Sequence, residues 1–139
     1  RTNFLGPVSI INIFANMFEE RGSGIIVGLS SVAGERGKAS NYLYGSSKAA
    51  FSSYLSGLRQ RLHKKKITVI TVKPGYVLTK MIMHKKLPFF LTISKKKAAE
   101  LIYKGIMSKR DIIYVGVIWF FIALILKIIP EKIYKTLRI

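Results

Sequence analysis

Apolar residues recur at steps of three and four along the start of the chain. From residue 3 to residue 20 the repeating positions are Phe4, Val8, Ile11, Phe14, Ala15 and Phe18. This spacing predicts an amphipathic helix with one buried face. The segment Arg21-Gly22-Ser23-Gly24 predicts its end, because glycine readily adopts the left-handed turn that closes many helices. Residues 25–29 are a short apolar run rich in β-branched side chains, which predicts a strand buried on both faces.

The next segments repeat this alternation of helix and strand. Residues 30–41 are small and polar, which predicts a loop, and residues 42–63 predict a long helix that ends at three lysines, 64–66, where cations suit the helix dipole. Its predicted inner face consists of Ala49, Ala50, Leu55, Leu58 and Leu62. Residues 67–72 predict a second buried strand, which the pair Pro74-Gly75 ends.

The last third of the chain starts without a clear pattern. Residues 81–92 predict a loop. Ser94 predicts the N-cap of a further helix, whose apolar positions are Ala98, Leu101, Ile102 and Ile106. Residues 112–115 predict a third strand. Alternating helices and strands predict an α/β fold with a doubly wound parallel sheet, helices on both faces, and the ligand beyond the carboxyl ends of the strands, at Ser30-Ser31, Pro74-Gly75 and Gly116.

Composition narrows the possible chemistry. The chain has no cysteine, which excludes disulfides and thiolate sites and is compatible with a reducing compartment. His63 and His84 are far apart in the sequence and have no carboxylate at ligand spacing, so we expect no metal site. The net charge is +18, of which residues 64–139 carry +14. This charge favours an anionic partner, although a lysine-rich solvated surface explains it equally well.

The main candidate for chemistry is the pair Tyr44 and Lys48. Positions four apart share a helix face, and a lysine ammonium stabilises the phenolate of a neighbouring tyrosine, which makes it a usable general acid and base. Taken alone, such a pair is more often an exposed contact without function. Ser31, at the predicted end of the first strand, could stabilise charge on a substrate oxygen or simply cap a turn. The segment 74–79 could hold a flat amide through its backbone or be an ordinary turn.

Four segments together resemble the short-chain dehydrogenase/reductase (SDR) family, in the family's order and at its spacings. They are Asn3-Phe-Leu-Gly6, Gly28-Leu-Ser-Ser-Val-Ala-Gly34, Tyr44-x-x-x-Lys48 and Pro74-Gly-Tyr-Val-Leu-Thr79. The resemblance covers the family's second half. It implies a Rossmann-like fold in which residues 1–115 form the C-terminal half of the domain and residues 116–139 a hydrophobic, basic helical segment.

The resemblance also implies roles for individual residues. Tyr44 passes a proton to the substrate oxygen, and Lys48 supports it and holds the nicotinamide ribose. Ser31 orients the carbonyl, and Asn3 holds a water in a proton relay. The cofactor-binding residues that it implies are Tyr44 and Lys48 together with Pro74, Gly75, Val77 and Thr79. The cofactor is NAD or NADP, which supplies the hydride.

The glycine-rich phosphate loop of the family and the residue that selects NAD or NADP are not found in these 139 residues. We therefore expect a fragment of a longer protein that is inactive by itself. Segments 31–36, 44–48, 74–81 and 129–139 are similar to the SDR branch that reduces decaprenylphosphoryl-2-keto-pentofuranose during cell-envelope synthesis. An alternative function within the same family is the reduction of another lipid or of a ketoacyl substrate. An alternative outside enzymes is a non-catalytic protein that binds anionic membranes.

The apolar C-terminal segment indicates whether the protein contacts a membrane or another copy of itself. Residues 112–129 are apolar or glycine except Lys127. If residues 112–115 form the last strand, the remaining stretch 116–129 is short for a membrane span of about twenty residues. We expect a helix at the membrane interface or over the substrate entrance, with Trp119 at headgroup level and Lys127, Lys132 and Lys135 facing lipid phosphates. A buried dimer interface is the alternative. We expect a cytoplasmic homo-oligomer that can contact the inner membrane face. Nucleic acid is not expected as a partner, because no aromatic residues interleave with the lysine runs.

Overall fold

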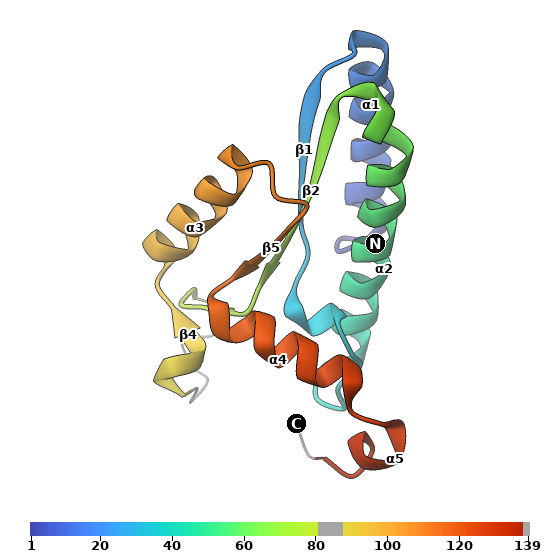
Figure 1. Ribbon diagram of the computed structural model, residues 1–139. Coiled ribbons are helices and arrows are strands. Elements are labelled where there is room, and N and C mark those ends of the chain that lie inside the picture. Colours follow the sequence, from blue (N-terminus) through green and yellow to red (C-terminus); the bar gives the residue numbers. More distant parts are fainter. Residues whose placement is uncertain (81–87, 138–139) are drawn as a thin grey trace.

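A computed structural model describes residues 1–80 and 88–137 (Figure 1). The helices are α1 (Leu5–Arg21), α2 (Tyr42–Leu62), α3 (Lys95–Met107), α4 (Val117–Ile128) and α5 (Glu131–Tyr134). The strands are β1 (Gly24–Leu29), β2 (Ile67–Pro74), β3 (Tyr76–Val77), β4 (Thr92–Ile93) and β5 (Ile112–Val115). Short 3-10 turns lie at Val32–Gly34, His63–Lys65 and Phe89–Leu91.

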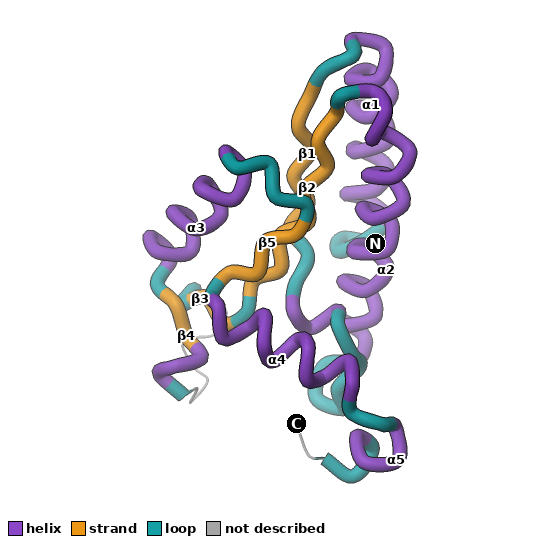
Figure 2. The backbone as a smooth tube through the Cα atoms, in the orientation of Figure 1, coloured by secondary structure: helices purple, strands orange, loops and turns teal. Residues whose placement is uncertain are grey.

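The central sheet has three parallel strands in the order β1-β2-β5. Gly24 pairs with Ile67 at one end of the β1–β2 ladder and Leu29 with Val72 at the other. The β2–β5 ladder ends with Pro74 beside Val115. Helix α2 connects β1 to β2, and α3 precedes β5, so the parallel α/β architecture predicted from the alternating pattern is confirmed (Figure 2).

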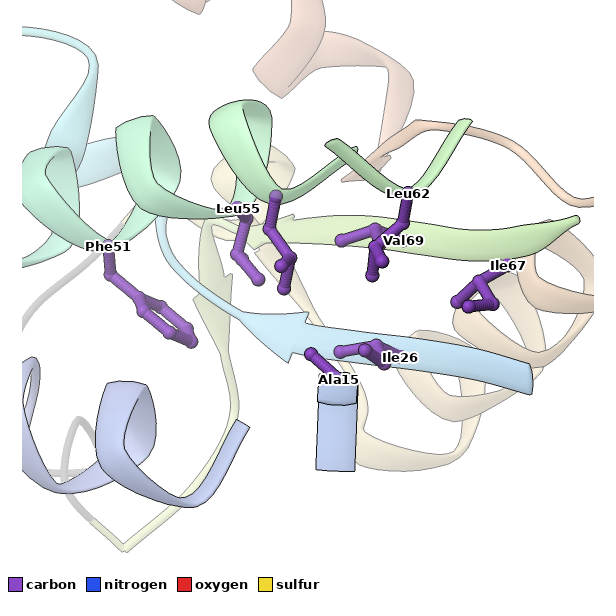
Figure 3. Close-up of a cluster of buried hydrophobic side chains, with 8 residues drawn as sticks. Ala15, Ile26, Phe51, Leu55, Leu62, Ile67 and Val69 are labelled. Atoms are coloured by element: carbon purple, nitrogen blue, oxygen red, sulfur yellow. The ribbon is translucent and has the colours of Figure 1, made fainter. Parts of the chain in front are cut away.

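Two hydrophobic clusters lie on opposite faces of the sheet. Helices α1 and α2 cover one face, where Leu55 and Leu62 of α2 meet Ile26 of β1 and Val69 of β2 (Figure 3). Helix α3 packs on the other face against a cluster that includes Ile70 and Val72. Strand β2 supplies both clusters because successive side chains of a strand point to opposite faces. This explains why its sequence is a run of β-branched residues that does not alternate between apolar and charged positions.

Most predicted elements agree with the structure, but the predicted inner faces of two helices differ from it. In α1, Ala15 is fully buried, whereas Phe14, predicted to face inward, is 47% exposed. Helix α1 touches the core along a narrow stripe, so the residue beside Ala15 already points to solvent. In α2, Phe51 is buried and the predicted Ala49 and Ala50 are half-buried. Phe51 lies four residues before Leu55 and therefore shares its face.

The segments predicted to be loops contain short structured stretches. The predicted loop 30–41 includes the 3-10 turn Val32–Gly34. Within 81–92, residues 81–87 and with them His84 lie outside the described part of the chain, and Thr92–Ile93 form β4, which pairs in parallel with β3. Ser94 caps α3 as predicted, since its Oγ accepts the N–H of Lys97 at 3.2 Å.

Candidate active site at the carboxyl edge of the sheet

The carboxyl ends of the three central strands lie at one edge of the sheet, because all three strands are parallel. The segments that follow them are Ser30-Ser31, Gly75-Tyr76 and Gly116. The backbone N–H of Ser30 donates to the carbonyl of Val72 at 2.8 Å, which extends the β1–β2 ladder up to this edge. The prediction that the segments after the three strands meet at one edge of the sheet is therefore confirmed.

Tyr44 and Lys48 lie on the first turns of α2 at this edge. The Lys48 ammonium lies 5.8 Å from the centroid of the Tyr44 ring and donates to the carbonyl of Leu29 at 2.8 Å. This bond places the ammonium at the end of β1. Burial lowers the pKa of Lys48. Tyr44 is 39% exposed, so its phenol is open to solvent while the lysine beside it is held in place.

The Ser31 loop is packed tightly against the same turns of α2. A Cβ atom at Gly34 would lie 2.7 Å from the backbone nitrogen of Ala49, and one at Gly45 would lie 2.8 Å from the carbonyl oxygen of Ala33. Ser30 Oγ adds a bond to the carbonyl of Lys48 at 2.9 Å. Two glycines, Gly34 on the loop and Gly45 on the helix, therefore allow the loop to approach residues 45–49 of α2 closely.

Replacing Gly34 by alanine should destabilise the protein by about 1–3 kcal/mol, because the new methyl group would overlap backbone atoms of α2 that cannot rotate away. The matched control is Gly57→Ala in α2, where nothing lies within 4 Å of the added carbon. Alanine there should stabilise by about 0.5–1 kcal/mol through its better helix propensity. Urea unfolding followed by circular dichroism measures both. Equal effects of the two substitutions would contradict the close packing.

The hydroxyl of Ser31 makes two local hydrogen bonds. Its oxygen accepts the N–H of Ala33 at 3.1 Å, and it donates to the carbonyl of Pro74 at 3.4 Å. Among the described residues no hydrogen bond joins Ser31 to Tyr44, so the structure joins the two residues through the packing of their segments. Asn3 lies just before α1 and lines a shallow surface pocket of about 350 Å³ together with Tyr44 and Ser47. The structure therefore brings Asn3 and Tyr44 to one place.

The segment 74–79 turns away from β2 and forms a short edge strand. Val77 pairs with Ile93 of β4, and the N–H of Leu78 donates to the carbonyl of Ile93 at 2.9 Å. Because successive residues of a strand turn their N–H and C=O groups to opposite edges, those of Val77 face away from β4. Thr79 follows and is half-buried. On the side away from β4, Val77 therefore presents one donor and one acceptor, which is the pair that a planar carboxamide needs.

Helix α4 begins directly after β5 and packs over this turn, which corrects two expectations. Trp119, predicted to anchor in lipid headgroups, is 5% exposed and donates to the carbonyl of Leu91 at 3.2 Å. Lys127, predicted to face lipid phosphates, bonds the carboxylate of Glu35 at 2.8 Å. The Trp119 ring is buried because it packs on the turn after β2, whereas the Lys127 side chain stays 51% exposed and only its ammonium bonds the loop after β1. Within residues 1–80 and 88–137, no helix combines the length and apolar character needed to cross a membrane.

Sequence reasoning missed a buried charged cluster at the same edge. Glu35 is 3% exposed in its side chain and bonds Lys73 at 2.6 Å and the hydroxyl of Tyr114 at 2.9 Å. Burial acts to raise the pKa of Glu35, but hydrogen bonds from Lys127, Lys73 and Tyr114 outweigh it and hold that pKa below its usual range. The one sequence signal was Lys73, a lysine that directly follows the apolar run of β2.

The fold and this edge together define an α/β domain of the Rossmann-like, doubly wound type. Residues 1–87 match the short chain dehydrogenase family. The chain belongs to the short-chain dehydrogenase/reductase family. An uncharacterized oxidoreductase of Mycobacterium tuberculosis is 26% identical over 140 residues, covering 98% of this chain and 54% of that relative. An acetoacetyl-CoA reductase of Cupriavidus necator is 35% identical over 81 residues, which are 58% of this chain and 33% of the relative.

Solved structures agree on the fold. A short chain dehydrogenase from Burkholderia cenocepacia in complex with NADP superimposes with a TM-score of 0.82 at 22% sequence identity. The match covers 96% of this chain and 56% of that one. The chain thus spans about half the length of the M. tuberculosis relative and of this structural neighbour.

Proposed function

We propose that this chain carries the proton-transfer half of an NAD(P)-dependent reductase that acts on a carbonyl group. The observation that carries the proposal is the Lys48 ammonium beside the Tyr44 ring, at the edge where parallel sheets bind their ligands. An ammonium there favours the phenolate, so Tyr44 can give a proton to a substrate oxygen and take one back. Ser31, on the loop that packs against α2, is the partner that orients that oxygen.

The other predicted residues complete the proposal. Asn3 shares the pocket of Tyr44 and holds a water that resupplies the proton. Lys48 also holds the ribose hydroxyls. Pro74 and Gly75 shape the turn, and Val77 with Thr79 bind the carboxamide of the nicotinamide, to which the backbone groups of Val77 that face away from β4 are suited. The cofactor, NAD or NADP, supplies the hydride when bound.

A carbonyl on a lipid-linked sugar is the substrate that we favour. The segments 31–36 and 74–81 are similar to the branch that reduces decaprenylphosphoryl-2-keto-pentofuranose. Helix α4 lies at this end of the sheet (Figure 1). Its exposed side chains are apolar, which favours a substrate with an apolar tail. These side chains are Val117, Phe120, Phe121, Leu124, Ile125 and Ile128. A ketoacyl thioester is the alternative, which the similarity to an acetoacetyl-CoA reductase favours.

The experiment is a substrate comparison with the longest natural form of the protein. Oxidation of NADPH or NADH is followed by absorbance with decaprenylphosphoryl-2-keto-pentofuranose and, separately, with acetoacetyl-CoA. We expect turnover of the lipid-linked sugar. The 139 residues alone should show none, since they lack the glycine-rich phosphate loop. Hydride transfer by the 139 residues alone would contradict that expectation.

The same assay distinguishes a reductase from a non-catalytic membrane-binding protein. A non-catalytic protein that contacts anionic membranes, which the net charge of +18 and the apolar face of α4 favour, would turn over neither substrate. It would instead float with liposomes that contain phosphatidylglycerol. Turnover without flotation would support the reductase and argue for α4 packing in a homo-oligomer.

A further inference from the structure

Helix α4 is attached at its first turn to the segment that follows β2. The Trp119 ring lies directly over Gly75, where an added Cβ would come within 2.0 Å of the ring. Its ring meets that of Tyr76 edge-on, with centroids 5.1 Å apart. The start of α4 therefore rests on the turn 74–76, next to the predicted carboxamide site.

The other end of α4 is attached to the loop that follows β1. Arg36 donates to the carbonyl of Leu126 at 2.7 Å and to the carbonyl of Ile129. Both carbonyls lie at the C-terminal end of α4, where helix geometry supplies no partner from within the helix. It also pairs with Glu131 at 2.6 Å. Its guanidinium lies 3.8 Å from the centroid of the Tyr134 ring. The Arg36 side chain is 15% exposed, so the helix end and α5 enclose it.

Glu35 adds a second attachment beside Arg36. One carboxylate oxygen pairs with Lys127 of α4, and the other pairs with Lys73 of β2 and accepts the hydroxyl of Tyr114 of β5. A single buried carboxylate thus joins the loop, two strands and the last turns of α4. Both residues follow Ser31 by only four and five positions, on the loop packed against α2.

We infer that Arg36 and Glu35 are positioning residues that hold α4 as a brace between the Ser31 loop and the turn 74–79. The brace comprises residues 117–134 and crosses the carboxyl edge of the sheet (Figure 1). It keeps the group that orients the substrate oxygen at a constant distance from the backbone that holds the carboxamide. The inference rests on the proposed reductase function, because that alignment matters only for transfer between two bound molecules.

The test compares Arg36→Ala with Arg61→Ala in the longest natural form of the protein. Arg61 bonds Asn16 and Glu19 of α1, away from the edge, and serves as the matched control. For Arg36→Ala we expect hydrogen exchange in residues 117–128 to accelerate about tenfold or more, because the helix end loses its anchor. We expect kcat to fall about 10- to 100-fold through misalignment, with KM for the cofactor nearly unchanged. Arg61→Ala should change neither quantity.

The results for Arg36→Ala test the inference directly. Faster hydrogen exchange with unchanged kcat overturns the inference, and so does unchanged hydrogen exchange. A wild-type protein that turns over no substrate contradicts the proposed function instead, and the exchange experiment still reports on the brace. If Arg36→Ala does not fold, Lys127→Gln removes only the pair between α4 and Glu35. It should shift both quantities in the same direction, and no shift in either overturns the inference.

Discussion

Replacing Tyr44 by phenylalanine in the intact protein should reduce turnover by about 10²- to 10⁴-fold, the usual contribution of a positioned general acid. The substitution removes one oxygen and leaves the ring, so the contact between the ring and the Lys48 ammonium remains. Cofactor affinity should therefore stay close to that of the wild type. Steady-state rates of NADPH or NADH oxidation, with cofactor titration by fluorescence, measure the two effects.

The matched control for this prediction is Tyr42→Phe. Tyr42 lies on the same turn of α2 and is 59% exposed, but it stands six residues before Lys48 and does not share its face. We expect wild-type turnover from this variant. Equal losses from Tyr42→Phe and Tyr44→Phe, or a parallel loss of cofactor binding, would point to misfolding and would remove Tyr44 from the proposed mechanism.

Replacing Glu35 by glutamine should lower the free energy of unfolding by about 3–5 kcal/mol, because removing one member of a buried pair leaves the other charge uncompensated. The Glu35 side chain is 3% exposed and that of Lys73 is 9% exposed. The exposed pair of Lys97 and Glu100 is the control: Glu100→Gln should cost less than about 1 kcal/mol, as surface ion pairs do. Urea unfolding at neutral pH measures both.

The loss of stability in Glu35→Gln should become smaller as the pH falls. The folded protein holds the pKa of Glu35 below the ordinary 4.5, since the hydrogen bonds from Lys127, Lys73 and Tyr114 together outweigh the effect of burial. A group with a lowered pKa in the folded state stabilises that state above its unfolded pKa. The difference between wild type and Glu35→Gln should therefore be full above about pH 4.5 and shrink as the pH falls below it. A difference that grew in acid would contradict the assignment.

The sequence predicted the architecture well because its signals are local. The apolar runs 25–29, 67–72 and 112–115 each became a strand of the parallel sheet. The interiors of helices were predicted less well. A helix face depends on what covers it, and the narrow contact of α1 leaves Phe14 exposed while the broader one of α2 buries Phe51. Periodicity alone does not distinguish these two cases.

The candidate site also has features that the sequence shows and features that only the structure shows. The identities and spacing of Tyr44, Lys48 and Ser31 are visible in the sequence, and parallel strands necessarily bring their carboxyl ends to one edge. The close approach of loop and helix depends on Gly34 and Gly45, whose neighbours are known only from the structure. The roles of the site residues stay predictions until turnover is measured.

By itself the sequence determined the order of helices and strands, the edge at which the polar residues gather, and the resemblance to a family. Periodic side chains, glycines and prolines act over a few residues, so these features can be inferred without coordinates. Only the tertiary structure decided the direction of Trp119 and Lys127 and the burial of Glu35 and Arg36. Arg36 and its partners on α4 and α5 are separated by 90 or more positions, and such contacts form only when the chain folds back on itself.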